Sequence, residues 1–186
     1  MYKHNEDFRF RFIKNYDISK IQPEIYKLEK EWLEDTQRQE LYEVHKETVT
    51  YFLTDYDLDW RVGDKYAGSV RNPNSPLYQL VKPIIEDLEK IHNGRVGRAI
   101  FPKLTAGKDI SGHYDEGVYL DVVRRNHIAI ITNPDVWFAV GGGWINMLEG
   151  ECWEINNMKW HEVSNKSDKD RVHLLIDIIP NQAIGQ

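Results

Sequence analysis

Two short segments of the sequence carry side chains that could bind one metal ion together. His113 and Asp115 stand in the segment GHYDEG, and His161 stands in the later segment WHEV. Because alternate residues of a strand point to one face, the imidazole of His113 and the carboxylate of Asp115 would converge on a strand. Two imidazole nitrogens and one carboxylate oxygen form the facial triad that binds non-haem Fe(II) and leaves coordination positions open.

A His-x-Asp pair alone is a weak signal, since chance gives roughly half an instance in a chain of this composition. By itself the pair is better explained as a surface histidine beside a surface aspartate. Arg171 adds weight, because it follows His161 across the turn-forming segment NKSDKD. We expect a hairpin there that returns the chain beside the His161 strand. Arg171 would then enter the apolar strand RVHLLIDII and need an anionic partner, either a surface carboxylate or a small dianionic cosubstrate.

The order and spacing of these segments resemble those of the aspartyl/asparaginyl β-hydroxylases, a family of Fe(II)- and 2-oxoglutarate-dependent oxygenases. The sequence is also similar to bacterial proline hydroxylases of the same branch. The resemblance runs from Arg98 to Asp177, and its most specific part is the terminal block that contains His161 and Arg171. The matching segments are RAIFPKL, the turn AG, GHYDEG, RNHIAI, EGECWEIN and HEVSNKSDKDRVHLLID.

The resemblance implies roles for six residues, with Fe(II) and 2-oxoglutarate as the cofactors and O₂ as the oxidant. The implied iron ligands are His113, Asp115 and His161. Arg171 would bind the distal carboxylate of 2-oxoglutarate. Arg125 and His127 match the family's Arg-x-His pair, which also contacts the cosubstrate. The implied reaction is hydroxylation of an unactivated C–H bond, in an amino-acid side chain that is free or part of a peptide or protein.

Two positions depart from the family pattern. The animal enzymes carry Gly where this chain has Asp115, so the chain is closer to the bacterial branch and its ordinary triad. The small hydroxyl residue that helps to hold 2-oxoglutarate falls near Pro102 here, and Thr105 is a candidate substitute. His173, two residues after Arg171, either lines the pocket or fills the barrel.

After about Arg95 the sequence changes to short β-rich segments separated by turn residues. About eight strands in roughly 100 residues fit a jelly roll. The expected fold class is therefore mainly β with flanking helices, a double-stranded β-helix of the cupin-like kind. The expected strands are RVGRAIF, VYLDVV (118–123), HIAIIT, VWFAV, CWEIN, HEV and VHLLIDII. The glycines 141–143 predict a hairpin turn.

Two helices and one strand are expected ahead of the barrel. Apolar residues at helical spacing predict the first helix over 18–32, with Ser19 and Gln22 at capping-box spacing. The segment TVTYFLT predicts a strand over 48–54. The second helix should begin after a Ser75 cap and end near Gly94.

Length and composition fit one globular domain over residues 1–186, with a helix-rich part about 1–94 packed on a β-barrel core about 95–180. The single cysteine, Cys152, excludes an internal disulfide and a multi-cysteine zinc site. The net charge of −6 disfavours nucleic acid as a partner. No apolar run is long enough for a membrane span, and no signal-peptide core is present, so we expect a cytoplasmic protein.

Four tryptophans in the barrel are expected to pack in the core, although they could also wall a substrate pocket. They are Trp137, Trp144, Trp153 and Trp160. Two other functions stay open from the residues alone. One is a non-catalytic cupin-like barrel that binds a metal or a small acid. The other is an isomerase or hydrolase that uses a different divalent metal on the same ligands.

Overall fold

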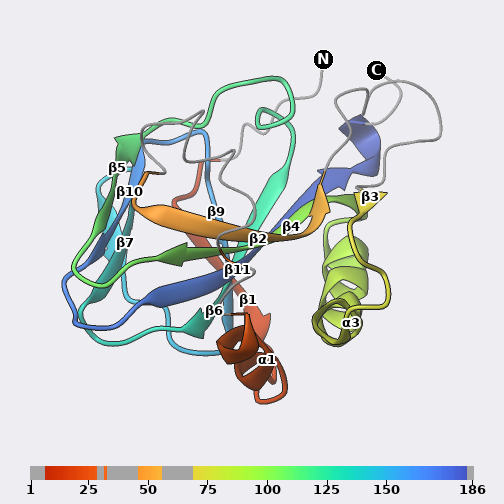
Figure 1. Cartoon of the computed structure of the whole chain (residues 1–186). Coiled ribbons are helices and arrows are strands. Elements are labelled where there is room, and N and C mark those ends of the chain that lie inside the picture. Colours follow the sequence, from red (N-terminus) through yellow and green to blue (C-terminus); the bar gives the residue numbers. More distant parts are fainter. Residues whose placement is uncertain (1–6, 29–31, 33–45, 56–68, 184–186) are drawn as a thin grey trace.

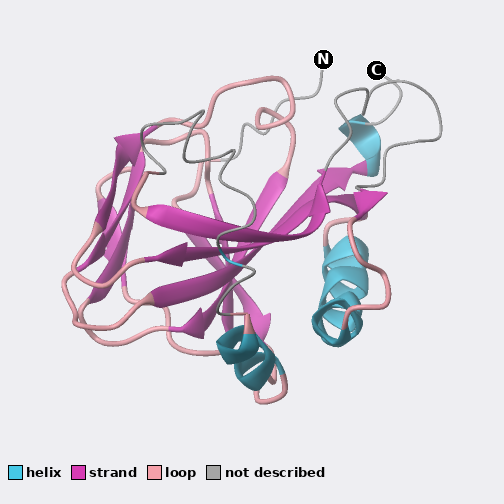
Figure 2. Cartoon of the chain, viewed as in Figure 1, coloured by secondary structure: helices cyan, strands magenta, loops and turns pink. Residues whose placement is uncertain are grey.

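The computed structural model describes residues 7–28, 32, 46–55 and 69–183. Two antiparallel sheets lie face to face within these residues, and the helices lie outside the larger sheet (Figures 1 and 2). The elements are β1 (Phe10–Asn15), α1 (Ile21–Lys27), β2 (Thr48–Asp55), β3 (Ser69–Val70), α3 (Pro76–Ile91), β4 (Gly94–Leu104), β5 (Asp109–His113), β6 (Arg124–Ile131), β7 (Val136–Val140), β8 (Gly143–Ile145), β9 (Glu151–Ile155), β10 (His161–Asn165), β11 (Arg171–Pro180) and the short 3₁₀ helix η3 (Asn181–Ala183).

The two sheets have the strand orders of a jelly roll. The larger sheet runs β1-β9-β6-β11-β4-β2-β3, and the smaller runs β5-β10-β7-β8. From β4 to β11, where every residue is described, the chain changes sheet at each connection except the one between β7 and β8. The expected fold class is therefore confirmed. The N-terminal half contributes strands as well as helices, since β1 pairs with β9 and β2 pairs with β4.

Strand β11 separates an apolar outer face from a polar inner face. All ten of its residues are buried. Val172, Leu174 and Ile176 belong to the core beneath the helices. The alternate residues, which include Arg171, His173 and Asp177, point to the other face, as the pleat of a strand requires. Burial on both faces is typical of a central strand that is covered on each side.

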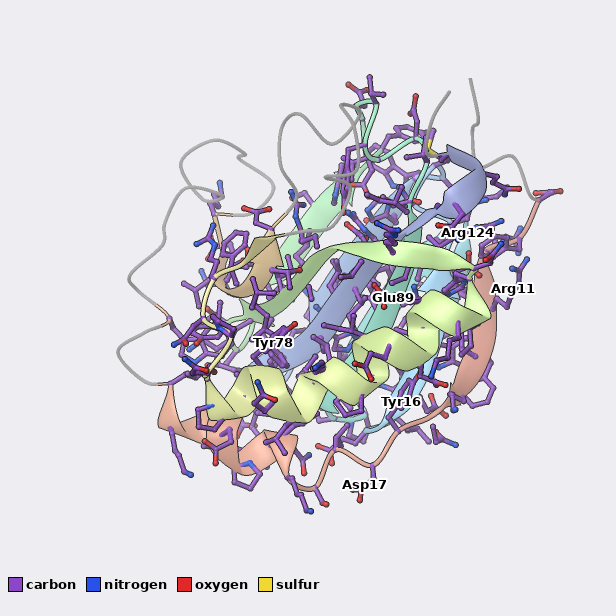
Figure 3. The ribbon with its side chains drawn as sticks, turned by 90° about the vertical axis from the view of Figure 1, so that its right-hand side faces the viewer. Arg11, Tyr16, Asp17, Tyr78, Glu89 and Arg124 are labelled. Atoms are coloured by element: carbon purple, nitrogen blue, oxygen red, sulfur yellow. The ribbon has the colours of Figure 1, made fainter. Side chains whose placement is uncertain are left out.

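Helix α3 lies across the outer face of the larger sheet (Figure 3). Its start agrees with the sequence, because the Ser75 hydroxyl accepts a hydrogen bond from the Tyr78 amide. Its end differs slightly: Asn93, with φ of 46°, takes the left-handed conformation expected of Gly94. Gly94 is needed for a different reason, since a Cβ there would lie 2.4 Å from the Ile179 carbonyl oxygen on β11.

Helix α1 is shorter than expected, and its predicted cap is wrong. The helix begins after Lys20, and no side chain caps it. Gln22 instead donates to the Ile130 carbonyl, which ties the helix to β6. Ile21 and Ile25 are buried as expected, and so is Trp32. Residues 29–31 of the expected helix lie outside the described residues.

Two expectations about the strands are wrong. The segment 118–123 forms turns, in which Tyr119 and Val123 are buried in a small core with Ile179. Tertiary packing thus overrides its β propensity. The chain between β10 and β11 does not form a hairpin within one sheet, because β10 pairs with β5 and β7 whereas β11 pairs with β4 and β6. Within the described residues, no helix is long and apolar enough to span a membrane.

Candidate metal centre

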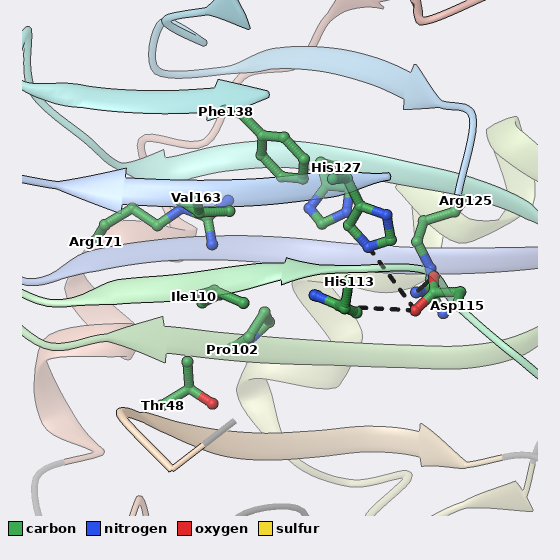
Figure 4. A pocket seen from close by; sticks show the side chains of 11 residues that line it. Thr48, Pro102, Ile110, His113, Asp115, Arg125, His127, Phe138, Val163 and Arg171 are labelled. Atoms are coloured by element: carbon green, nitrogen blue, oxygen red, sulfur yellow. Dashed lines mark hydrogen bonds and ion pairs between the residues drawn. The ribbon is translucent and has the colours of Figure 1, made fainter. Parts of the chain in front are cut away.

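Three side chains meet at one end of the smaller sheet. His113 ends β5 and is paired with His161, which begins β10, while Asp115 follows β5 by two residues. The Nε2 atoms of His113 and His161 each lie 3.8 Å from Oδ1 of Asp115 (Figure 4). One ligand atom from each residue falls within 4.8 Å of the others, so the group could hold a metal ion.

Backbone hydrogen bonds orient both imidazoles of this group. Nδ1 of His113 lies 2.8 Å from the Ser111 carbonyl oxygen, and Nδ1 of His161 lies 2.9 Å from the Lys159 carbonyl oxygen. A carbonyl only accepts, so both Nδ1 atoms carry the proton. A neutral imidazole with its proton on Nδ1 has its lone pair on Nε2, the atom through which such a histidine would bind a metal. Burial lowers the pKa of His161, which favours the same neutral form.

Arg125 on β6 connects Asp115 to a second carboxylate, that of the buried Asp177. Its Nη1 donates to Oδ2 of Asp115, while its Nε and Nη2 donate to Asp177 over 2.8 Å and 2.9 Å. The Tyr119 hydroxyl donates to the same Asp177 over 3.3 Å. Burial opposes the charge of Arg125, but the two carboxylates outweigh it and raise the pKa of the guanidinium above its usual value.

Arg171 lies elsewhere in the same cavity and has no carboxylate partner among the described residues. The residue is 1% exposed, and its Nη2 donates a hydrogen bond to Nδ1 of His173 over 2.7 Å. Its Nε has no partner. Burial without an opposing anion lowers the pKa of Arg171 to about 9, so the group is still charged at neutral pH. A buried charge of this kind needs a ligand of opposite charge.

The cavity that joins these groups has a volume of about 490 Å³, including its open mouth. Charged and polar side chains of both sheets line it together with apolar ones such as Phe138 and Ile110 (Figure 4). All six residues predicted for the site line this cavity, namely His113, Asp115, Arg125, His127, His161 and Arg171. The ring of His127 packs between Phe138 and His173, with centroids 5.1 Å and 5.7 Å away.

The sequence did not identify two residues at this site. Thr48 of β2 is buried and lines the cavity beside Pro102, whereas Thr105, the hydroxyl suggested by sequence, is exposed. Nothing in the sequence indicates that Thr48 lines the cavity, because its place depends on the order of the strands in the sheet. Asp177 could be found from the sequence. It stands an even number of residues after Arg171 on the same strand, so the two side chains point to the same face of the sheet.

Three of the four tryptophans do not pack as expected, whereas Trp153 packs against the core of the barrel. Trp137, Trp144 and Trp160 are 44%, 49% and 46% exposed, so core packing is wrong for these three. They do not wall the cavity either, since none of the four is among its lining residues. Trp160 instead covers Gly112, where a Cβ would lie 2.2 Å from the indole ring. Cys152 is buried, and burial raises the pKa of its thiol, in agreement with an inert role.

A jelly roll that encloses a His–Asp–His group with open coordination positions is typical of non-haem Fe(II) oxygenases. The chain belongs to the aspartyl/asparaginyl beta-hydroxylase family, whose model matches residues 16–180. The resemblance noted from the sequence is thereby confirmed, and it extends well beyond the segments that first carried it. Membership of this family supports a hydroxylase.

Solved structures with the same fold include two oxygenases. A viral collagen prolyl hydroxylase from Paramecium bursaria Chlorella virus-1, solved with 2-oxoglutarate, has a TM-score of 0.62 at 8% identity, over 94% of this chain and 97% of the other. A 2-oxoglutarate–Fe(II) oxygenase family protein from Burkholderia pseudomallei has a TM-score of 0.52 at 11% identity, over 92% and 96%. At this identity the likeness is one of fold. The search of the curated proteins found no match.

Proposed function

We propose that the protein is an Fe(II)- and 2-oxoglutarate-dependent dioxygenase that hydroxylates an amino-acid side chain, free or within a peptide or protein. The proposal rests on the surroundings of Arg171. Arg171 is buried and shares a cavity with the His–Asp–His group, and among the described residues no carboxylate forms an ion pair with it. A cavity with a metal-ligand group at one place and an unpaired fixed cation at another suits a dianionic metal chelator.

The donor set fits Fe(II). Both histidines donate through Nδ1 to backbone carbonyls, so Nε2 is the nitrogen of each that would bind the ion, and Asp115 adds one carboxylate oxygen through Oδ1. Two nitrogens and one carboxylate on one side of an ion leave the opposite positions for a cosubstrate and O₂. Because Oδ2 of Asp115 is held by Arg125, the carboxylate would bind the ion through a single oxygen.

The charges also fit a divalent cation together with a dianion. The two carboxylates Asp115 and Asp177 surround one guanidinium, so this side of the cavity carries one net negative charge. Arg171 provides one positive charge elsewhere in the cavity. The metal ion would bind at the negative side, and the distal carboxylate of 2-oxoglutarate would bind the Arg171 guanidinium.

When bound, Fe(II) and 2-oxoglutarate would supply O₂ activation, so that substrate C–H, 2-oxoglutarate and O₂ become substrate C–OH, succinate and CO₂. The chain would contribute orientation and the exclusion of water. Arg171 fixes one end of the keto acid, Thr48 adds a hydroxyl nearby, and Phe138 and Ile110 keep the cavity wall apolar.

The test is succinate release from 2-oxoglutarate with Fe(II) and O₂, against free amino acids and against peptides that contain aspartate, asparagine or proline. We expect succinate formation that depends on Fe(II), and a hydroxylated product visible by mass spectrometry. Asp115→Ala is the matched control and should abolish turnover. If the wild-type protein binds metal and 2-oxoglutarate without any succinate release, the protein is a non-catalytic barrel and the proposal fails.

A further inference from the structure

We propose that Asp177 is a positioning residue for the metal centre, which it serves through Arg125. The inference rests on the proposed function and names the residue that holds the carboxylate ligand in place. Asp177 does not line the cavity and cannot touch a bound ion directly. Its effect must therefore pass through the side chain that it binds.

The contacts form one continuous chain of hydrogen bonds from Asp177 to the ligand group. Asp177 is fully buried and accepts from both Nε and Nη2 of Arg125, a bidentate pair that fixes the plane of the guanidinium. The remaining terminal nitrogen, Nη1, is thereby aimed at Oδ2 of Asp115. With Oδ2 occupied, Oδ1 is the oxygen that faces the two histidines, 3.8 Å from each Nε2.

The charge of Asp177 acts in the same direction as its geometry. A guanidinium bound to a ligand carboxylate would repel an incoming divalent cation if nothing else neutralised it. Asp177 supplies the second negative charge, so the Asp115–Arg125–Asp177 group remains net negative toward the ion. Removing that charge while Arg125 stays would weaken metal binding in two ways. Arg125 would be less well oriented toward Asp115, and the group would lose its net negative charge.

The proposal differs from the role that the family resemblance gives Arg125, which is contact with the cosubstrate. Three of its five N–H groups are used by the two carboxylates. If Arg125 acts mainly on Asp115, loss of Asp177 should lower affinity for the metal alone. If Arg125 acts mainly on the cosubstrate, loss of Asp177 should lower affinity for 2-oxoglutarate and leave the metal affinity unchanged.

The experiment compares Asp177→Asn with a matched control, Glu154→Gln, by Mn²⁺ titration of the metal-free protein followed by electron paramagnetic resonance. Glu154 is also fully buried and also binds two arginines, Arg11 over 3.0 Å and Arg124 over 3.2 Å. Figure 3 shows Arg11 and Arg124 near each other beside one end of α3, and neither they nor Glu154 line the cavity. The control therefore reports the loss of a buried carboxylate that does not serve the site.

We expect Asp177→Asn to weaken Mn²⁺ binding by about 10- to 100-fold, the usual cost of losing a group that orients a metal ligand. Glu154→Gln should bind Mn²⁺ like the wild type. Equal Mn²⁺ affinity in Asp177→Asn and the wild type would overturn the inference. A wild-type protein that binds no Mn²⁺ would instead contradict the proposed function.

Tyr119→Phe provides a milder variant in case Asp177→Asn does not fold. It removes the hydroxyl that donates to Oδ2 of Asp177 and keeps the buried ring. The loss of one hydrogen bond should weaken Mn²⁺ binding by about two- to tenfold. An unchanged Mn²⁺ affinity in folded Tyr119→Phe would count against the chain of contacts from Tyr119 to Asp115.

Discussion

Two buried arginines in one cavity have opposite surroundings. Arg125 is bound by Asp115 and Asp177, and its pKa is raised above the usual value. Arg171 donates a hydrogen bond to His173, and burial lowers its pKa to about 9. The same residue type therefore serves two purposes: Arg125 completes an internal ion pair, whereas Arg171 holds a charge for which the described residues supply no anion.

The difference shows where a ligand belongs. An ion pair that is complete within the protein contributes to the native structure and requires nothing from outside. A guanidinium that is buried without an anion costs folding free energy, and a protein retains such a group where binding recovers that cost. The two arginines should therefore respond differently to substitution and to pH.

The largest effect is expected from Arg125→Met, which leaves the buried Asp177 and the partly buried Asp115 without their shared cation. Removing one partner of a buried ion pair typically lowers the free energy of unfolding by about 3–5 kcal/mol. Urea denaturation of the metal-free protein measures this directly. A loss as small as that of an exposed ion pair, below about 1 kcal/mol, would contradict the account of Arg125.

The effect of Arg171→Met on the free energy of unfolding should have the opposite sign to that of Arg125→Met. Replacing an unpaired buried charge with an apolar side chain should leave the free energy of unfolding unchanged or raise it, by about 1–3 kcal/mol. The same variant should bind 2-oxoglutarate about 100-fold more weakly or worse, because the charged hydrogen bonds to its distal carboxylate are lost. Calorimetry with Mn²⁺-loaded protein tests the affinity, and wild-type affinity in this variant would remove Arg171 from the site.

The affinity for 2-oxoglutarate should fall at high pH. Burial lowers the pKa of Arg171 to about 9 in the free protein, and only the protonated guanidinium binds a carboxylate. Above that pH, binding must take up a proton, so the affinity should decrease by up to about tenfold per pH unit. Below it the affinity should be constant down to neutral pH. Titrations of Mn²⁺-loaded protein between pH 7 and 10.5 check this, and a flat profile would contradict it.

The smallest effect is expected from His173. Burial, the charge of Arg171 and His127 keep the pKa of His173 well below its usual value. The unfolded chain then binds more protons than the native state, so this group lowers stability as pH falls below about 6.5. Between pH 7 and 5.5 the free energy of unfolding should fall in both proteins. The fall in His173→Phe should be smaller than that in the wild type by about 1 kcal/mol. An identical decline in both proteins would contradict the prediction.

Much of the jelly roll could be predicted from the sequence, because short β-rich segments alternate with turn residues after Arg95. What the sequence could not supply was the choice of sheet for each strand. The segment NKSDKD predicts a reversal of the chain but not that β11 joins the other sheet, so the expected hairpin was wrong. The segment 118–123 has strong β propensity, yet its Tyr119 and Val123 are buried in a separate small core with Ile179.

The candidate site was more predictable than the packing around it. Residues two apart on a strand share a face, and this rule brings Arg125 near His127 and Arg171 near His173. The contacts of Arg125 with Asp177 and the place of Thr48 depend on which strands are neighbours, which is a long-range property. Trp137 and Trp144 are exposed and not in the core, because aromatic content alone does not tell which face of a strand is covered.

The most direct measurement is a crystal structure of the protein with Mn²⁺ and 2-oxoglutarate. The account predicts one ion bound by Nε2 of His113, Nε2 of His161 and Oδ1 of Asp115, with the distal carboxylate of the keto acid on the Arg171 guanidinium. An ion bound away from these three residues, or a keto acid that leaves Arg171 without a carboxylate partner, would contradict it.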